Sequence, residues 1–360
     1  MKKTIKFFIL CLFAANISYA QSNKELAEAK AKEAIRIEDE EGRFDAAIEL
    51  LQEAQNLDPE SITYPYELSY AYQGKKDYKK AIDILEKLLK HKDVYAQIYH
   101  ALGNAYDYSG KPKKAMQAYE DGLKKFPDAG ELYLELGNMN VSAQDYNKAL
   151  TYYEKGIEVD PAYPSNYYWA AKIFCGSSER VWGMIYGEIF MNLERNSKRT
   201  AEISKLLFDT YQKAIVLKSD TSISVSFSKN NTINASDLLS GNFKLPFGTG
   251  CYEMVTIMAV AGFKSVDLNT LDSIRTGFVT FYFNGNKFSK YPNVLFDYQQ
   301  KIKNAGFLDA YNHWILMKGD EAGFLKWQDE NKARWMEFIN WFDENKLALD
   351  DNHKFYRAQY

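Results

Sequence analysis

The chain has 360 residues, of which 46% are hydrophobic and 15% aromatic, so it can bury a sizeable core in about two domains. It carries 45 Lys and Arg against 48 Asp and Glu, a formal net charge of −3. This balance excludes the strongly basic class of nucleic-acid-binding proteins, and we expect no nucleic-acid partner.

The first 20 residues have the pattern of an export signal. Three lysines precede the apolar run 7–13, and Ser18-Tyr19-Ala20 places small residues at the two positions that a signal peptidase reads. The apolar run is too short to span a bilayer, which takes roughly 20 residues. We therefore expect a signal peptide over residues 1–20, cleavage between Ala20 and Gln21, and a periplasmic or secreted protein with no membrane span.

Cys11 raises the alternative of a lipid anchor. The residues before it, Phe8-Ile9-Leu10, lack the small residue usual ahead of a lipidated cysteine, and Cys11 lies inside the apolar run. The pattern therefore favours ordinary export.

Residues 28–161 contain four repeats of 34 residues. An alanine marks each repeat, at Ala47, Ala81, Ala115 and Ala149, and a proline follows three of them by 12 residues, at Pro59, Pro127 and Pro161. A proline at this place ends a helix and begins a turn. A period of 34 is typical of a solenoid of helical hairpins.

The first half of each repeat is predicted to be a helix with one tightly packed face. In the third repeat, Tyr99, Leu102 and Tyr106 share a face, and Gly103 leaves room for a neighbouring helix. Gly137 is the corresponding residue of the fourth repeat. Gly42 and Gly110 fit the turn between the two helices of their repeats.

This pattern resembles the tetratricopeptide (TPR) repeat family over residues 28–161, with a degenerate fifth repeat possible to about residue 197. The first repeat departs from it at Ile35 and Glu38, and the second lacks a closing proline. An atypical terminal repeat is expected in a solenoid.

The resemblance implies a concave groove, lined by the first helices, that binds a protein or peptide. The ligand-facing positions of the family correspond here to Lys32, Arg36, Tyr66, Tyr70, Gln73, Gln97, His100, Asn104, Asp107, Tyr108, Glu131, Leu134 and Asn138, with Tyr168 and Lys172 in the fifth repeat. The asparagines could bind a peptide backbone, and the tyrosines offer stacking area. The alternative is that some tyrosines only pack on neighbouring helices.

Beyond Pro161 the pattern predicts helices without a recognisable family. We expect helices at 181–193 and at 198–218, the latter capping the solenoid, and a domain boundary at Ser219. Alternation at Ile223, Val225 and Phe227 predicts a strand, and Asn230-Asn231 a turn. Helices are then expected at 251–261, 268–283, 294–305, 307–318 and from 319 or 320 to 345.

The predicted fold is therefore all-α. A TPR-type α-solenoid of four to five helical hairpins spans residues 21–218, followed by a mainly helical domain at 219–360. The last predicted helix has an aromatic stripe, which is more often core than a ligand platform: Phe324, Trp327, Trp335, Phe338, Trp341 and Phe342.

The sequence offers one weak candidate for catalysis. Cys251 follows a glycine-rich turn at the predicted start of a helix, where a thiolate is favoured, and His313 could act as its base. The alternatives are a disulfide with Cys175 and an inert buried thiol, and the last is favoured. No metal-ligand spacing or cofactor motif is present, so we expect neither a metal nor a cofactor.

These observations favour an exported, non-catalytic TPR scaffold that binds a protein or peptide. Two alternatives remain open. The same tyrosines could stack on sugar rings in a glycan-binding surface component, or the C-terminal domain could be an enzyme with a Cys251 nucleophile.

Overall fold

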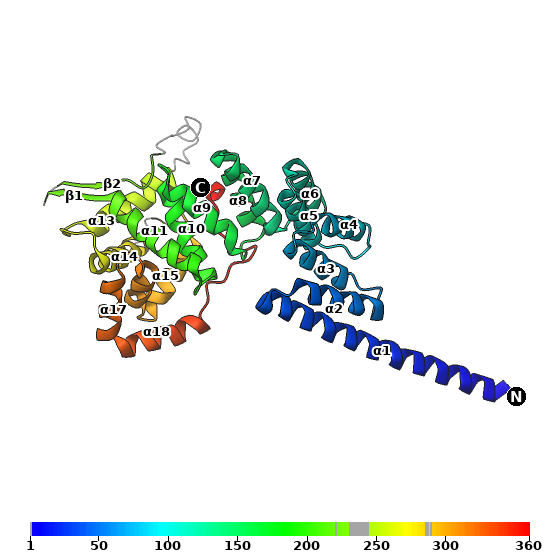
Figure 1. Ribbon diagram of the computed structural model, residues 1–360. Coiled ribbons are helices and arrows are strands. Elements are labelled where there is room, and N and C mark those ends of the chain that lie inside the picture. Colours follow the sequence, from blue (N-terminus) through cyan, green and yellow to red (C-terminus); the bar gives the residue numbers. More distant parts are fainter. Residues whose placement is uncertain (1, 220–221, 230–244, 285–287, 289) are drawn as a thin grey trace. The chain divides into compact units, whose positions relative to one another are not determined.

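The structure is a computed structural model that describes residues 2–219, 222–229, 245–284, 288 and 290–360. The chain divides into two compact units, Met1–Met139 and Asn140–Tyr360, each described here by itself (Figure 1). The boundary predicted at Ser219 lies inside the second unit and stays a prediction, and the turn predicted at Asn230-Asn231 lies outside the described residues.

The first unit is a stack of helical hairpins. Its helices are α1 (Lys2–Glu41), α2 (Phe44–Leu57), α3 (Thr63–Gly74), α4 (Tyr78–Leu88), α5 (Ala96–Tyr108), α6 (Pro112–Lys125) and the first part of α7 (Gly130–Ser142). From α1 to α6, each helix packs against the next one along the chain. This arrangement confirms the all-α solenoid and the order of first and second helices that the 34-residue period predicts.

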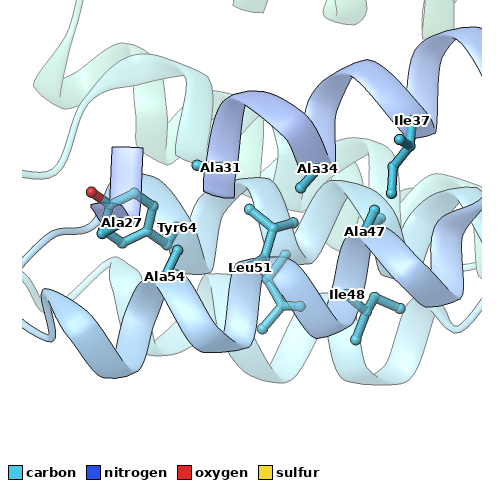
Figure 2. Close-up of a cluster of buried hydrophobic side chains, with 11 residues drawn as sticks. Ala27, Ala31, Ala34, Ile37, Ala47, Ile48, Leu51, Ala54 and Tyr64 are labelled. Atoms are coloured by element: carbon cyan, nitrogen blue, oxygen red, sulfur yellow. The ribbon is translucent and has the colours of Figure 1, made fainter. Parts of the chain in front are cut away.

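The marker alanines are buried where the helices pack against one another. Ala47, Ala81 and Ala115 are fully buried, as is Ala149 in the second unit. Figure 2 shows the packing in the first repeat, where Ala31 and Ala34 of α1 and Ala47 of α2 belong to one cluster of buried side chains. Small side chains let the helix backbones approach, and the larger residues of the cluster fill the remaining space.

The turn inside each repeat has the same backbone conformation. Gly42, Lys76, Gly110 and Gln144 follow one another at the repeat spacing, and their φ angles are 65°, 62°, 76° and 60°. Glycine adopts this left-handed region without a steric cost, whereas a side chain clashes with the backbone there. The two predicted turn glycines are confirmed, and the other two repeats accept some strain.

Gly103 admits an aromatic ring from the second helix of its own repeat. A Cβ atom at this position would lie 2.0 Å from Cε1 of Tyr119, a residue of α6. Only a residue without a side chain fits here, which confirms that Gly103 is a position of close approach. Tyr119 itself is almost completely buried.

The second unit begins with the end of the repeats. Its first helices are α8 (Tyr146–Val159), α9 (Pro164–Cys175), α10 (Arg180–Leu193) and α11 (Lys198–Ala214). The helices α9 and α10 form the predicted fifth hairpin, and a Cβ at Gly183 would lie 2.6 Å from the backbone nitrogen of Cys175. The hairpin therefore packs as tightly as a repeat, although its sequence departs from the pattern.

The helix predicted at 198–218 ends earlier than expected. After Ala214 the chain forms β1 (Ile215–Ser219), which pairs antiparallel with β2 (Ser222–Val225), and Ile215 lies opposite Val225. Consecutive β-branched residues favour a strand, and the pairing partner that the alternating pattern predicts at Ile223 and Val225 completes it.

The remaining elements are mainly helical. They are the π-helical turn η1 (Gly248–Glu253), α13 (Met254–Val260), α14 (Leu268–Phe283), α15 (Val294–Asn304), α16 (Leu308–Leu316), α17 (Glu321–Glu330), α18 (Lys332–Glu344) and the 3₁₀ turn η3 (Arg357–Gln359). The helices predicted at 251–261, 268–283, 294–305 and 307–318 are present with small differences in their ends.

The last predicted helix is wrong in one respect, because it is two helices. The chain breaks at Asn331, whose φ of −119° and ψ of 31° are not helical. Both the backbone N–H and the side-chain amide of Asn331 donate to the carbonyl of Trp327. A side chain that competes in this way for a backbone acceptor disturbs a helix. The aromatic stripe is buried or half-buried along both helices.

A buried polar network connects several helices of the second unit. The guanidinium of Arg275 on α14 donates to both carboxylate oxygens of Glu188 on α10, at 2.9 and 2.7 Å. Glu188 also accepts from Gln299 at 2.5 Å and from Tyr311 at 2.9 Å. Since Arg275 and Glu188 are almost completely buried, their charges depend on each other.

The last residues of the chain are anchored within the same unit. Phe355 is fully buried and lies against Trp182 and Tyr186, with ring centroids 6.1 and 5.8 Å apart. Arg357 donates to both carboxylate oxygens of Glu154, at 2.9 and 2.6 Å. These contacts fix the C-terminal segment against α8 and α10.

Candidate binding surface of the repeats

Tyrosines form a row along the first helices of unit 1, and two of them are exposed. Tyr70 of α3 is 54% exposed and Tyr108 of α5 is 64% exposed, which is unusual for large aromatic side chains. The ring centroid of Tyr66 lies 6.5 Å from that of Tyr70 and 5.5 Å from that of Tyr95. Tyr78 packs beside Tyr108 at 6.0 Å. Three of these residues, Tyr66, Tyr70 and Tyr108, are at positions that the TPR resemblance indicates.

Three carboxylates interact where α1 and α3 pack together, and one of them, Glu67, directly follows Tyr66 in the chain. Burial, Asp39 and Glu67 together raise the pKa of Glu38 to about 7. Burial also raises the pKa of Glu67, with a further contribution from Asp39. The three acidic groups therefore repel one another, and they extend from the end of α1 to α3.

A hydrogen-bonded group occupies the α5 and α7 part of the surface. Nε2 of His100 lies 3.2 Å from Oε1 of Glu135, and the Asn138 amide donates to Oε2 of the same carboxylate at 3.1 Å. The Asn104 side-chain nitrogen lies 3.3 Å from Nε2 of His100, and Tyr119 donates to the Asn104 oxygen at 2.6 Å. The structure thus brings together His100, Asn104 and Asn138, all predicted from the sequence.

This arrangement constrains the chemistry of His100. A single ring nitrogen cannot donate to Glu135 and accept from the Asn104 amide at the same time. The Asn104 oxygen accepts from Tyr119, so the Asn104 amide nitrogen is the atom beside the ring. Nε2 can therefore accept from Asn104 in one tautomer and donate to Glu135 in the other. Asn104 is thus half-buried, and its side chain is engaged by Tyr119 and His100 within the protein.

Two further predicted residues have buried atoms without a hydrogen-bond partner among the described residues. These atoms are Nε2 of Gln73 on α3 and Oε1 of Glu131 on α7. A buried polar atom that lacks a partner is costly, so both atoms could gain from a ligand. Asp107 is exposed, while Leu134 is buried and packs in the core.

The predicted residues of the fifth repeat lie in the second unit and are engaged there. Tyr168 donates to Oε2 of Glu202 on α11 at 2.5 Å, and Lys172 forms an ion pair with Oε1 of the same residue at 2.7 Å. Lys172 also lies 4.9 Å from the ring centroid of Tyr168. Tyr168 is buried by this packing, so its ring surface is already covered.

The sequence-based list omits the carboxylates Glu67 and Glu135. Glu67 directly follows Tyr66, and Glu135 directly follows Leu134, which holds the same ligand-facing position in the fourth repeat as Tyr66 does in the second. The two carboxylates are therefore two repeat lengths apart. This shared register is a signal that could have identified them. Glu38 offers no such signal, because its pKa depends on contacts between α1 and α3.

The candidate catalytic cysteine has no access to solvent. Cys251 is fully buried, Cys175 is buried as well, and no disulfide joins the two residues, so the alternative disulfide is not formed. Burial raises the pKa of Cys175 to about 12. His313 bonds through Nδ1 to the carbonyl of Asp309 at 2.8 Å and stacks on Trp327. A buried thiol is inert toward substrates in solution.

Within the part of the chain that the structure describes, no His, Cys, Asp and Glu side chains form a group that could hold a metal ion. The same residues include no helix with the length and apolar character needed to cross a membrane.

Comparison with protein families identifies the repeats. Residues 40–105 and residues 100–167 each match a family model described as tetratricopeptide repeat. Together with the 34-residue register and the stacked hairpins, these matches show that residues 40–167 belong to the tetratricopeptide repeat family. No curated protein matches the chain.

Several solved structures are similar in part. The protein PilF of Pseudomonas aeruginosa is 18% identical, with 53% of this chain and 86% of that chain covered and a TM-score of 0.44. A tetratricopeptide repeat protein of Parabacteroides merdae is 13% identical, with 88% and 99% covered and a TM-score of 0.38. YrrB, described as a TPR protein with an unusual peptide-binding site, is 20% identical, with 50% and 92% covered and a TM-score of 0.33.

Proposed function

We propose that this chain is a scaffold that binds a protein or peptide segment through the first helices of its first unit. TPR repeats of this kind suggest a protein–protein interaction scaffold. The observation that carries the proposal is the exposure of Tyr70 and Tyr108, two large rings on successive first helices. Aromatic side chains that stay in water on a rigid helical surface are the usual anchors of an interface.

The proposal includes no catalytic step. TPR-family proteins are generally non-catalytic scaffolds, and the thiol that the sequence offers as a nucleophile is buried. The proposal also includes export, which the lysines and apolar run of residues 1–20 support. N-terminal sequencing of the cell-derived protein should give Gln21 as the first residue, and a lipid-modified Cys11 would contradict export in soluble form.

Site-specific photo-cross-linking tests the binding proposal directly. A benzophenone amino acid replaces Tyr70 or Tyr108 in the full chain, and Tyr146 in a matched control. Tyr146 is also an exposed tyrosine, at 50%, but it begins the second helix α8 rather than lying on a first helix. We expect cross-links to one partner from positions 70 and 108 in cells, and none to that partner from position 146.

Cross-linking of the partner at position 146 alone would contradict the proposal. Thermal melts of the three substituted proteins show whether the replacements leave the fold intact.

A further inference from the structure

The tyrosine row is bordered by carboxylates that have no cation beside them. Among the described residues, Glu38, Asp39, Glu67 and Glu131 form no ion pair with a lysine or arginine, whereas many other acidic groups of the unit do. The nearby cation of α1, Arg36, is held by Glu33, Glu40 and Glu41. The negative charge of these four carboxylates is thus not neutralised by an ion pair within the described residues.

Tyr66 interacts both with these carboxylates and with the neighbouring tyrosine rings. The rings of Tyr70 and Tyr95 lie 6.5 and 5.5 Å from its own ring, and the charges of Glu67 and Glu131 act on its phenol. Burial is the main reason that the pKa of Tyr66 lies above its ordinary value. Carboxylates of two different repeats, Glu67 and Glu131, therefore act on the same tyrosine.

A positively charged side chain of a ligand would interact favourably with both the tyrosine rings and the carboxylates. A cation over a tyrosine ring is attracted by the π face, and the same cation relieves the repulsion between half-buried carboxylates. It can also supply the donor that the buried Oε1 of Glu131 lacks. A neutral segment would cover the rings but leave the carboxylates desolvated and uncompensated, and an acidic segment would add repulsion.

We infer that the segment bound by this surface is basic, with lysine or arginine side chains placed between Glu67, Glu131 and the rings of Tyr66 and Tyr70. This inference rests on the proposed function, because it names the chemistry of the partner at the same surface. A solenoid that is acidic on this face selects an extended basic peptide segment over neutral ones by charge complementarity.

Selection from a random dodecapeptide library tests the inference. The full chain is immobilised in three forms: the natural sequence, Glu67→Gln/Glu131→Gln, and the matched control Glu49→Gln/Asp83→Asn. The control removes the same two charges from exposed positions on the second helices α2 and α4. Thermal melts verify that each form is folded.

The natural sequence and the control should both enrich peptides in lysine and arginine over the unselected library, and the Glu67/Glu131 variant should not. A peptide from the enriched pool should bind the Glu67/Glu131 variant about tenfold more weakly by fluorescence anisotropy, as expected for two lost charge contacts. Selected peptides without basic enrichment, or equal enrichment by the variant, would overturn the inference.

The cross-linking experiment distinguishes a failure of the inference about a basic segment from a failure of the proposed function. Partner capture at positions 70 and 108 together with a library result that shows no charge preference would retain the scaffold and reject the basic segment. Loss of capture at both positions would reject the scaffold itself.

Discussion

The hydroxyl of Tyr119 donates a 2.6 Å hydrogen bond to the side-chain oxygen of Asn104, and this bond joins the interior of the third repeat to its outer face. The ring of Tyr119 reaches this place only because Gly103 has no side chain. Asn104 in turn lies beside His100, which contacts Glu135. The buried Tyr119 is therefore connected through Asn104 to the polar group formed by His100 and Glu135.

Gly103→Ala should destabilise the protein by about 1–3 kcal/mol, because the new methyl group would overlap the Tyr119 ring. Urea unfolding followed by circular dichroism measures this loss. Gly176→Ala is a matched control, because a Cβ there meets only carbonyl oxygens at 3.5 and 3.6 Å. Equal stability of the two variants would mean that α5 and α6 do not pack as described.

Tyr119→Phe should have a smaller effect, about 0.5–1.5 kcal/mol, since it removes one hydrogen bond and keeps the ring. Asn104→Ala should also lower stability, because it leaves the buried Tyr119 hydroxyl without its acceptor. The double variant should cost less than the sum of the two single changes. Additive losses would show that the two side chains do not interact.

The inter-helix turns give a prediction of opposite sign at two equivalent positions. Gly110→Ala should destabilise by about 1 kcal/mol through backbone strain alone, because φ is 76° and no atom lies within 4 Å of the added Cβ. Lys76→Gly should raise the melting temperature, since φ is 62° there. Melting curves that move the other way would mean that the repeats do not share one turn.

The carboxylates at the α1 end predict a pH-dependent stability. Burial, Asp39 and Glu67 raise the pKa of Glu38 from an ordinary 4.5 to about 7, so the folded state holds this proton more tightly than the unfolded state. The stability contributed by Glu38 is fully present below pH 4.5 and is lost as the pH rises through 7.

Glu38→Gln should therefore raise the melting temperature relative to the natural sequence at pH 8, and much less at pH 5. Glu49→Gln, at an exposed position of α2, controls for the loss of one negative charge. A stabilisation by Glu38→Gln that is the same at both pH values would remove the basis for this prediction.

The buried pair of the second unit predicts strong coupling. Arg275→Met leaves the Glu188 carboxylate buried without its cation and should cost about 3–5 kcal/mol. Adding Glu188→Gln removes the stranded charge, so the double variant should recover part of this loss in urea unfolding. A double variant that is less stable than Arg275→Met would contradict the account of the pair.

The repeat half of the molecule could be predicted from the sequence because its pattern is local. The spacing of Ala47, Ala81 and Ala115 and the glycines at 42 and 110 determine helix packing and turns within one repeat. The same repeat register predicts that Tyr66, Tyr70 and Tyr108 are at ligand-facing positions. The break at Asn331 and the strand at Ile215 were not predicted. The break depends on a side-chain bond to Trp327 and the strand on pairing with the adjacent segment Ser222–Val225, and the helical period of the sequence displays neither.

The polar part of the surface also depends on contacts that a sequence does not display. Glu135 joins His100 to Asn138 across two helices, and Glu38 meets the charge of Glu67 only after α1 and α3 pack together. The Arg275–Glu188 pair links residues far apart in the chain. Such groups become visible only when the tertiary structure brings them together.

The most direct test of the central claim is the affinity of the cross-linked partner for Tyr70→Ala/Tyr108→Ala, measured by calorimetry against the natural sequence and Tyr146→Ala. If the tyrosine row is the binding surface, loss of two anchors should weaken binding by at least about thirtyfold, roughly 2 kcal/mol, with an unchanged melting temperature and no effect of Tyr146→Ala. Unchanged affinity of the folded double variant would contradict the account.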